Sequence, residues 1–342
     1  MTQPQISFII INYNGAIYLP RLLKSISDQS ESSHETIVVD NGSTDDSIKI
    51  LSQLNHKFKL VKSTNIGYGR GCNLGASKSI GKFFVFLNPD TYLDRNYQKN
   101  ILTSYNHSQK KSSLPIGCLN CIICEFDSKL PLTSSKIDSI IDIFGNPRGI
   151  PTTKPNNSFV ILGSGLFISH QVFRGIGGFN PNFFLYGEEL DLCWRLVING
   201  YRNVSVDRAY IYHLGSGSIG KQRSYQLALM TYGSFLSAFT NYQATSLIFI
   251  LPVYTLYLIF LALLIPIYLN FNTEYDRHLF KLFKNFIYTF PKIYNFRYQV
   301  QKQRTKTDFE IHHYLSLIPT AVVNLYRRFT STNTSLSPKN DN

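Results

Sequence analysis

The fold is decided by the stretch ISFIIINYNG at residues 6–15, together with TIVVDNGS at residues 36–43 and FFVFLNPD at residues 83–90. Each segment opens with an apolar run of strand length and ends in a cluster of polar residues. A further short strand is expected at 58–61, and helices are expected at 17–29, 44–54 and 68–79. This alternation predicts an α/β fold with a mostly parallel central sheet flanked by helices.

Three polar clusters follow the predicted strands: Asn12-Tyr13-Asn14, Asp40-Asn41-Gly42-Ser43 and Asn88-Pro89-Asp90. In open α/β sheets, ligands bind beyond the carboxyl ends of the strands. Ordinary turn chemistry accounts for one such cluster. Three clusters at three strand ends indicate one shared ligand crevice.

The composition fits a protein with a full core and a polyanionic partner. The 342 residues are 44% apolar, and 34 Lys and Arg against 21 Asp and Glu give a net charge of +13. Such a charge favours nucleic acid, a phosphorylated substrate or anionic lipid. No helix-turn-helix, RRM or zinc-finger pattern is present, so we expect no nucleic acid partner.

The N-terminal stretch and the cysteines bear on the compartment. The first 15 residues lack a basic segment, and the apolar run at residues 6–11 is too short for a signal peptide, so we expect the bulk of the chain in the cytosol. The five cysteines fit a reducing compartment. Cys118, Cys121 and Cys124 form a CxxCxxC run without a fourth ligand at metal spacing, which favours a buried strand over a metal site.

After residue 112 the sequence pattern defines the helices and strands less clearly. Residues 112–157 look irregular around one or two strands, and strands are expected at 159–168, 203–206 and 210–213, with a helix beginning near Glu188. We expect a catalytic domain at 1–235 and a hydrophobic, basic, membrane-associating region at 236–342.

Residues 247–269 carry no charge over 23 residues, which suffices to span a bilayer. Pro252 and Pro266 interrupt them, and a basic, aromatic segment follows. A single span would place that segment outside, against the positive-inside tendency. We therefore favour a re-entrant or in-plane insertion, with one true span and a buried soluble helix as the alternatives.

Acidic residues and one histidine can carry chemistry in the crevice. Asp90 is suited to hold Mg²⁺ or Mn²⁺ against a diphosphate, and His213 is a candidate second ligand. Glu188, Glu189 and Asp191 start a predicted helix and are candidates for a base that deprotonates a hydroxyl. Arg195 lies one turn beyond Asp191 and can pair with it.

The glycine-rich stretch NIGYGRGCNLG at residues 65–75 was tested against the dinucleotide-binding motif. The third glycine of that motif falls on Cys72, so the stretch does not match it. It is a glycine-rich helix start whose Asn65 and Arg70 can reach a nucleotide or its phosphates.

Seven blocks in order resemble the inverting family 2 glycosyltransferases of the GT-A fold, in the rhamnosyltransferase-like branch of bacterial surface-polysaccharide biosynthesis. They are FIIINYNG, VVDNGSTDDS, NIGYGRGCNLG, FLNPDT, GSGLFIS, IGGFNPNFFLYGEELDLCWRL and YHLGSGS, and they cover nearly two-thirds of the chain. The resemblance implies that Asn12, Tyr13 and Asp40 line the nucleotide pocket. Asn88-Pro89-Asp90 takes the place of the DxD metal motif, with His213 as a partner ligand. Gly177-Gly178-Phe179 matches the loop that leads to the acceptor.

Two positions depart from the family pattern. The catalytic base of the family is the Asp of a Glu-Asp pair, where this chain has Glu189, so Glu189 and Asp191 both remain candidates for the base. Asn180 replaces a usual Asp after Gly-Gly-Phe.

The resemblance implies a single in-line displacement with inversion, in which a sugar passes from a nucleoside diphosphate to a hydroxyl of a polyprenyl-linked glycan in capsule, O-antigen or related synthesis. We favour rhamnose from dTDP-rhamnose. UDP-galactofuranose, UDP-N-acetylglucosamine and UDP-glucose are alternative donors, and an inactive membrane scaffold is an alternative function. The expected location is the cytoplasmic face of the bacterial inner membrane, with anionic lipid as a further partner.

Overall fold

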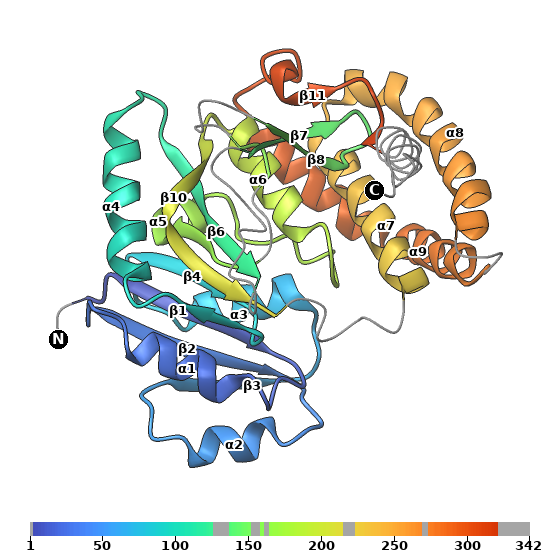
Figure 1. Ribbon diagram of the computed structural model, residues 1–342. Coiled ribbons are helices and arrows are strands. Elements are labelled where there is room, and N and C mark those ends of the chain that lie inside the picture. Colours follow the sequence, from blue (N-terminus) through green and yellow to red (C-terminus); the bar gives the residue numbers. More distant parts are fainter. Residues whose placement is uncertain are drawn as a thin grey trace, which may run out of the picture.

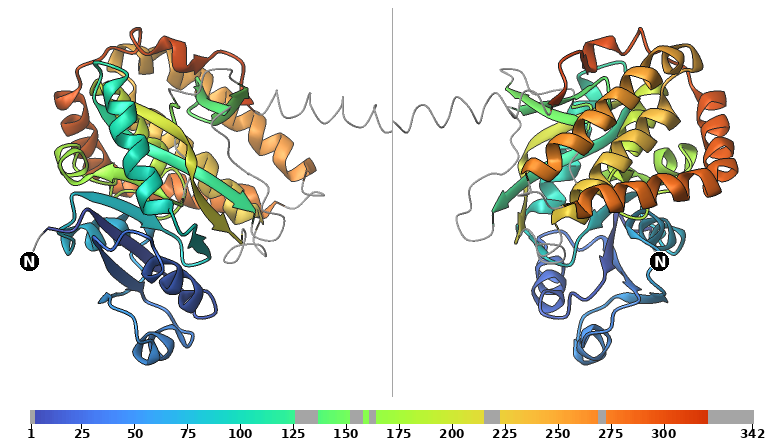
Figure 2. Two further views of the ribbon diagram at one scale, coloured as in Figure 1. Left: turned by 60° about the vertical axis from the view of Figure 1, so that its left-hand side comes forward. Right: turned by 90° about the vertical axis from the view of Figure 1, so that its right-hand side faces the viewer.

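The computed structural model describes residues 3–125, 137–151, 158–160, 164–214, 223–268 and 273–320 (Figure 1). Its main element is an eight-stranded mixed sheet with the strand order β3-β2-β1-β4-β9-β6-β10-β5. The predicted α/β class is confirmed. Helices cover both faces of this sheet, and a further layer of helices lies beyond one of them (Figure 2).

The first half of the sheet matches the sequence prediction closely. Strands β1 (Ile6–Asn12), β2 (His34–Asn41), β3 (Lys59–Ser63) and β4 (Phe83–Leu87) are parallel and alternate with helices α1 (Leu19–Ser27), α2 (Ser47–Gln53) and α3 (Tyr68–Ser77). Every residue of β1 is buried, as expected for a strand covered on both faces. Helix α3 packs closely because a Cβ at Gly75 would lie only 2.4 Å from Ile9 Cγ2.

The second half of the sheet adds strands of both directions. These are β5 (Thr91–Leu93), β6 (Ile116–Glu125), β9 (Leu166–Ser169) and β10 (Arg202–His213), with helices α4 (Tyr97–Lys110), α5 (His170–Gly175) and α6 (Glu188–Ile198). Strand β9 runs antiparallel to β4 and β6, and β5 runs antiparallel to β10. The two strands expected at 203–206 and 210–213 are one strand, because β10 continues through an irregularity in its pairing with β6 between Ser205 and Tyr210.

Two further strand predictions need correction. The strand expected at 159–168 is shorter and later, since β9 begins at Leu166, while residues 161–163 lie outside the described residues. The described residues of the stretch at 112–157 contain three strands instead of one or two, because β7 (Ile137–Asp142) and β8 (Pro147–Pro151) follow β6 and join β11 (Leu315–Ser316) in a second small sheet. Asp142 shapes the β7–β8 turn by accepting hydrogen bonds from the backbone N–H groups of Phe144 and Asn146.

The cysteines of the CxxCxxC run lie buried in β6, as predicted. Cys118 donates to Asn203 Oδ1 at 3.2 Å and lies 3.9 Å from Cys193 Sγ. Burial raises the thiol pKa of Cys118 and of Cys121.

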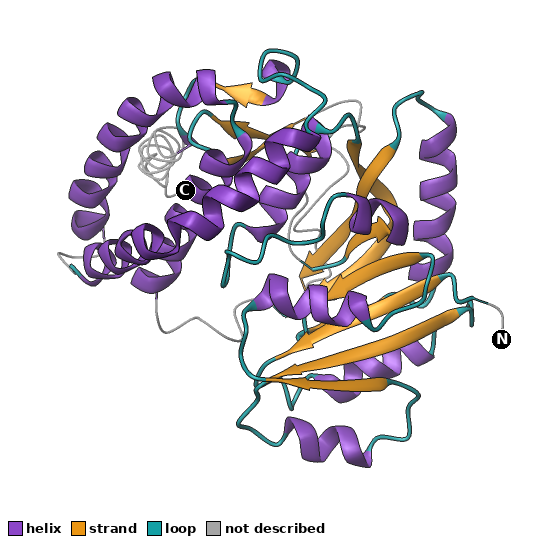
Figure 3. Cartoon of the chain, turned by 180° about the vertical axis from the view of Figure 1, so that it is seen from behind, coloured by secondary structure: helices purple, strands orange, loops and turns teal. Residues whose placement is uncertain are grey.

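Three apolar cores organise the molecule. Helices α1, α2 and α4 cover one face of the main sheet, and α3, α5 and α6 cover the other, as seen from behind in Figure 3. The third core joins the outer side of α6 to β7 and to helices α7 (Arg223–Asn241), α8 (Ala244–Tyr268) and α9 (Glu274–Gln303). A short 3₁₀ helix, His312–Tyr314, follows.

Helix α6 is therefore enclosed on two sides. Its Trp194 contacts Phe159 at 5.6 Å and Tyr242 at 4.8 Å between ring centroids. The expected domain boundary after residue 235 falls inside α7, so the two expected parts share a helix and a core.

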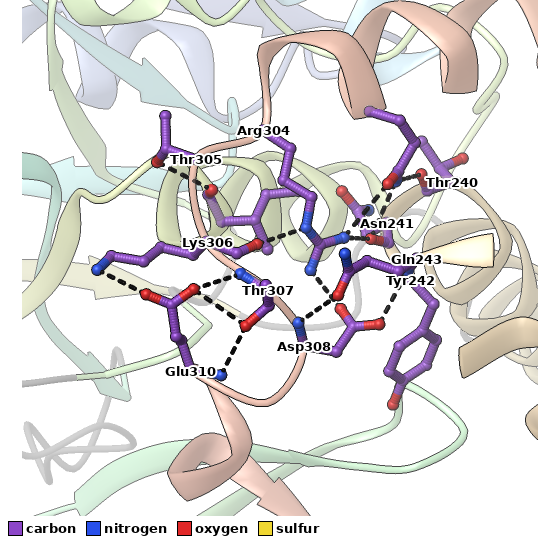
Figure 4. A network of polar contacts seen from close by, with 12 residues as sticks. Thr240, Asn241, Tyr242, Gln243, Arg304, Thr305, Lys306, Thr307, Asp308 and Glu310 are labelled. Atoms are coloured by element: carbon purple, nitrogen blue, oxygen red, sulfur yellow. Dashed lines mark hydrogen bonds and ion pairs between the residues drawn. The ribbon is translucent and has the colours of Figure 1, made fainter. Parts of the chain in front are cut away.

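A polar network ties the end of α7 to the chain after α9 (Figure 4). Arg304 donates to the Asn241 carbonyl and pairs with Asp308, and Asp308 accepts from the Gln243 N–H. Arg297 donates to the carbonyls of Thr240 and Tyr242. The last carbonyls of a helix lack intrahelical partners and favour cations, so these arginines cap α7.

Candidate active site

The residues expected at the nucleotide end lie at the carboxyl ends of β1 and β2. Asn12 and Asp40 are paired in register, and Asn12 Nδ2 donates to Asp40 Oδ1 at 3.1 Å and to Ser43 Oγ at 3.0 Å. Both side chains are buried, and Asn12 Oδ1 has no hydrogen-bond partner among the described residues. Tyr13 is 43% exposed beside them.

The ends of β1 and β4 also meet. A Cβ at Gly15 would lie 2.5 Å from Asn12 Oδ1 and 2.7 Å from Pro89 Cβ. Only a glycine fits between these two loops. The cluster that contains Asn88 and Asp90 therefore lies against the one that contains Asn12, as the prediction of a shared crevice requires.

Asp90 and His213 come together through the antiparallel pairing of β5 with β10. Thr91 is the register partner of His213, and the Leu214 N–H donates to the Asp90 carbonyl at 3.0 Å. His213 Nε2 lies 3.3 Å from Asp90 Oδ1. This is an ion-pair distance, but the two atoms are not aligned as a hydrogen bond, and Nε2 is buried without another partner among the described residues.

This pair fits two ligands of a divalent cation. Neighbouring ligands of an octahedral cation with bonds of about 2.1 Å lie about 3 Å apart. In the described part of the chain no group of three or more His, Cys, Asp or Glu gathers at one point, so Asp90 and His213 form a pair and are not part of a larger cluster there. A Mg²⁺ or Mn²⁺ site bound mainly through substrate phosphates has this composition.

A pocket of about 220 Å³ opens beside Asp90. It is lined by Ile17, Tyr18, Arg21, Asp90, Thr91, Tyr92 and Leu214. The Arg21 guanidinium lies 4.1 Å from the Tyr92 ring centroid, and Tyr92 stacks on Tyr212 at 4.5 Å. No sequence pattern singled out Arg21, because an arginine on the polar face of an amphipathic helix is an ordinary surface residue.

Asn65 and Arg70 connect the nucleotide end to the loop before α6. Asn65 Oδ1 accepts from the Gly67 N–H at 3.2 Å, and Asn41 Nδ2 donates to the Gly67 carbonyl at 3.3 Å. Arg70 Nε donates to the Pro181 carbonyl at 2.6 Å. The predicted contact of Arg70 with a nucleotide is untested, and in this structure the side chain joins α3 to the loop that leads into α6.

The acidic cluster begins α6 after an unusual turn. Tyr186 and Gly187 both have positive φ, of 66° and 96°, which turns the chain sharply into the helix. Positive φ at a non-glycine residue stores strain of the kind that gathers at functional sites. The turn directs Glu188 toward α3, where a Cβ at Gly69 would lie 3.4 Å from Glu188 Cβ.

Glu188 and Glu189 have perturbed acidities. Glu188 is buried, and its Oε2 has no hydrogen-bond partner among the described residues. Burial, reinforced by the neighbouring Glu189, raises the pKa of Glu188 well above its ordinary value. Burial raises the pKa of the partly buried Glu189 to about 7. A carboxylate with a pKa near neutrality is a suitable general base.

Asp191 has a different environment. Its Oδ2 accepts from Arg195 Nε at 2.7 Å, and its Oδ1 accepts from Asn241 Nδ2 at 3.0 Å. The carboxylate is fully buried, and the predicted Asp191–Arg195 pair is confirmed. Both oxygens are engaged in the interior, so the structure does not favour Asp191 as the base.

Arg195 in turn holds the Gly-Gly loop. Its two terminal nitrogens donate to the carbonyls of Ile176 and Gly178, each at 2.8 Å. Asn73 on α3 grips the same loop, since its side chain donates to the Phe179 carbonyl and accepts from the Phe179 N–H. The loop that the resemblance assigns to the acceptor side is thus fixed from two helices.

Comparison with known proteins agrees with this geometry. Residues 7–116 match the family model described as Glycosyl transferase family 2. An uncharacterized glycosyltransferase of Haemophilus influenzae is 32% identical over 159 residues, covering 44% of this chain and 62% of the relative. An N-acetylglucosaminyl-diphospho-decaprenol L-rhamnosyltransferase of Mycobacterium tuberculosis is 23% identical over 253 residues, covering 64% of this chain and 79% of the relative.

Solved structures show the same fold. A mannosyltransferase from Pyrobaculum calidifontis, solved in complex with GDP-Man and Mn²⁺, superposes with a TM-score of 0.53 at 16% identity, covering 95% of this chain and 88% of that one. The chain spans 28% to 62% of the length of three curated relatives that it matches, the Haemophilus influenzae protein among them. The chain thus has a GT-A-like α/β fold, and its residues 7–116 are similar to glycosyl transferase family 2.

Proposed function

We propose that this protein is an inverting, metal-dependent glycosyltransferase that moves a sugar from a nucleoside diphosphate to a glycan hydroxyl. The observation that carries this proposal is a set of unpartnered buried atoms. Three of the ten such side-chain atoms among the described residues, Asn12 Oδ1, Glu188 Oε2 and His213 Nε2, belong to residues expected in the crevice. Buried polar atoms without a protein partner are uncommon, and a bound ion, water or ligand is one explanation for them.

Each end of the crevice has its own task. Asn12, Asp40 and Tyr13 lie where the nucleotide would bind. Asp90 and His213 would hold Mg²⁺ or Mn²⁺, which would neutralise charge on the departing diphosphate. Glu189, with a pKa of about 7, would accept the proton of the attacking hydroxyl. Burial and the charge of Glu189 raise the pKa of its neighbour Glu188 well above the ordinary value, which disfavours a second negative charge beside the base.

For the donor we favour dTDP-rhamnose, and for the acceptor a polyprenyl-linked glycan at the cytoplasmic face of the bacterial inner membrane. The order of the sequence blocks and the name of the mycobacterial relative support this choice. UDP-galactofuranose, UDP-N-acetylglucosamine and UDP-glucose are the alternative donors.

The test is a panel of these four nucleotide sugars, offered with Mn²⁺ and a polyprenyl-diphosphate-linked acceptor to the purified protein. Transfer from dTDP-rhamnose with inverted anomeric configuration, seen in the NMR spectrum of the product, is the expected result. Transfer from one of the UDP-sugars instead would show that this UDP-sugar, and not dTDP-rhamnose, is the donor. If no donor turns over, and none is hydrolysed, the inactive scaffold becomes the better explanation.

A further inference from the structure

Helix α8 lies along the outer rim of the helical layer (Figure 1). One of its faces packs against the rest of the protein. Leu247, Tyr254, Tyr257 and Leu261 are buried in the third core. Two hydrogen bonds anchor this face: Tyr254 Oη donates to the Phe144 carbonyl at 3.0 Å, and Asn146 Nδ2 donates to Tyr257 Oη at 3.2 Å. The Tyr257 ring also stacks on Phe144 at 3.9 Å.

The opposite face of α8 is exposed and apolar. It carries Ile248, Phe249, Val253, Leu256, Ile259, Phe260 and Leu263, all more than 40% exposed. The helix contains no charged residue and is long and apolar enough to cross a membrane. An apolar stripe of this length is rarely left in water, so this exposed α8 face needs a partner.

Helix α9, which contacts α8 and packs along α7, supplies charge next to this face. One side of α9 is buried through Tyr275, Leu279, Ile293 and Val300. Its exposed side mixes the aromatic and aliphatic residues Phe280, Ile287, Tyr288 and Tyr294 with Lys281, Lys284 and Lys292. After Asp276, no acidic residue occurs in α9. Aromatic side chains interleaved with lysines suit the headgroup region of an anionic bilayer.

We propose that the exposed α8 face and the aromatic-basic side of α9 dock on an anionic lipid bilayer, with α8 lying in the membrane plane instead of crossing it. The packed stripe runs from Leu247 to Leu261, about 21 Å along the helix axis. A crossing helix would have to break these contacts, including both tyrosine hydrogen bonds. In-plane binding keeps them and covers the apolar stripe. The lysines also favour a lipid surface over a second copy of this cationic chain, which carries a net charge of +13.

The first test is binding of the full chain to sedimenting vesicles, either of pure phosphatidylcholine or with one-third phosphatidylglycerol. Binding is expected on the anionic vesicles. Changing Lys281, Lys284 and Lys292 together to Gln should weaken it about hundredfold. Changing Phe249, Leu256 and Leu263 together to Gln should abolish it. The matched control changes Ile80, Leu114 and Phe309 to Gln, since these residues are also apolar and exposed but lie outside the proposed surface. Equal loss in the control, or no binding by the unmodified chain, would overturn the proposal.

The second test measures how deeply α8 lies in the bilayer. Phe249→Trp, Leu256→Trp and Leu263→Trp place a probe at three points along α8, and lipids brominated at different acyl positions quench each probe according to its depth. Equal depths are expected for an in-plane helix. A spanning helix would separate the outer two probes by about 21 Å. The native Trp194 is fully buried and gives a constant background. A depth that changes steadily from Phe249→Trp to Leu263→Trp would overturn the in-plane geometry.

A further outcome would contradict the choice of partner. If the chain forms a soluble dimer, and changing Phe249, Leu256 and Leu263 to Gln dissociates it, the exposed α8 face binds a second copy of this chain. Neither test measures sugar transfer, so both are independent of the proposed reaction.

Discussion

His213 Nε2 lies 3.3 Å from Asp90 Oδ1, although 122 positions separate the two residues in the chain. The antiparallel pairing of β5 with β10 brings the two side chains together. The two atoms do not form a hydrogen bond with each other, and in the proposed function they would share a divalent cation.

The first prediction concerns this pair. Asp90→Ala should abolish sugar transfer, and His213→Ala should lower kcat/KM by roughly 10²-fold at limiting Mn²⁺, because a cation site with one ligand fewer binds its ion more weakly. Steady-state rates over a Mn²⁺ titration measure this, and excess Mn²⁺ should restore part of the His213→Ala activity. His107→Ala, an exposed histidine on α4, is the control. Activity of Asp90→Ala equal to that of the unmodified protein would contradict the metal assignment.

The second prediction is a pH dependence. Burial raises the pKa of Glu189 to about 7, so the fraction of ionised base, and with it kcat/KM, should rise as the pH passes from 6 to 8. Glu189→Gln should lose turnover at every pH, while Glu189→Asp should keep part of it. Initial rates from pH 5.5 to 8.5 provide the measurement. A flat profile for the unmodified protein would argue against Glu189 as the base.

The same pKa shift has a consequence for stability. The folded state holds the proton of Glu189 more tightly than the unfolded state does, so stability is lost as the pH rises from about 4.5 to about 7. The loss is on the order of 3 kcal/mol for a shift of this size. Glu189→Gln should therefore raise the Tm at pH 8 and leave it nearly unchanged at pH 4.5. Thermal unfolding followed by circular dichroism at the two pH values would reveal the difference.

The third prediction separates Asp191 from the glutamates. Asp191→Asn leaves the buried Arg195 guanidinium without its charge partner, which should destabilise the protein by about 3–5 kcal/mol. Urea unfolding measures this change. Asp28→Asn removes the acid of the exposed Lys24–Asp28 pair and should change stability by less than about 1 kcal/mol. If Asp191→Asn keeps its full stability but loses turnover, Asp191 takes the place of Glu189 as the base.

The fourth prediction concerns the network at the end of α7. Arg304→Met removes the donor to the Asn241 carbonyl and leaves the buried Asp308 carboxylate without its cationic partner, which should cost about 3–5 kcal/mol of unfolding free energy. Glu310→Gln is the matched control, because Glu310 and Lys306 form a pair of the same spacing at the surface. Similar stability of the two variants would show that the Arg304 contacts contribute little.

The sequence predicted the first half of the fold because each strand there is buried and bounded by polar turns. Phe83–Leu87, for example, is a strand with the predicted bounds. The prediction from the sequence failed for strands whose partner strands are distant in the chain. Strand β7 pairs with β11, whose residues lie more than 170 positions away, and no local pattern announces such a pair.

In the candidate site, too, the features with a local sequence pattern were predicted, and those that depend on distant residues were not. The polar clusters after β1, β2 and β4 were visible as sequence patterns, and their juxtaposition follows from parallel strands. The buried position of Asp191 was not visible, because it depends on Asn241 of α7, fifty residues further on. Whether an acidic residue at a helix start faces a crevice or the interior is decided by what packs against that helix.

The enclosure of α6 between two cores has a practical consequence for work with this protein. A shorter protein that ends at residue 235 would lose the ring contact between Tyr242 and Trp194. It would also lose the hydrogen bond that Asn241 donates to Asp191. The shortened protein would then expose α6, the helix that carries Glu188 and Glu189. Solubility is better sought by exchanging side chains on the outward stripe of α8, which leaves the inner one intact.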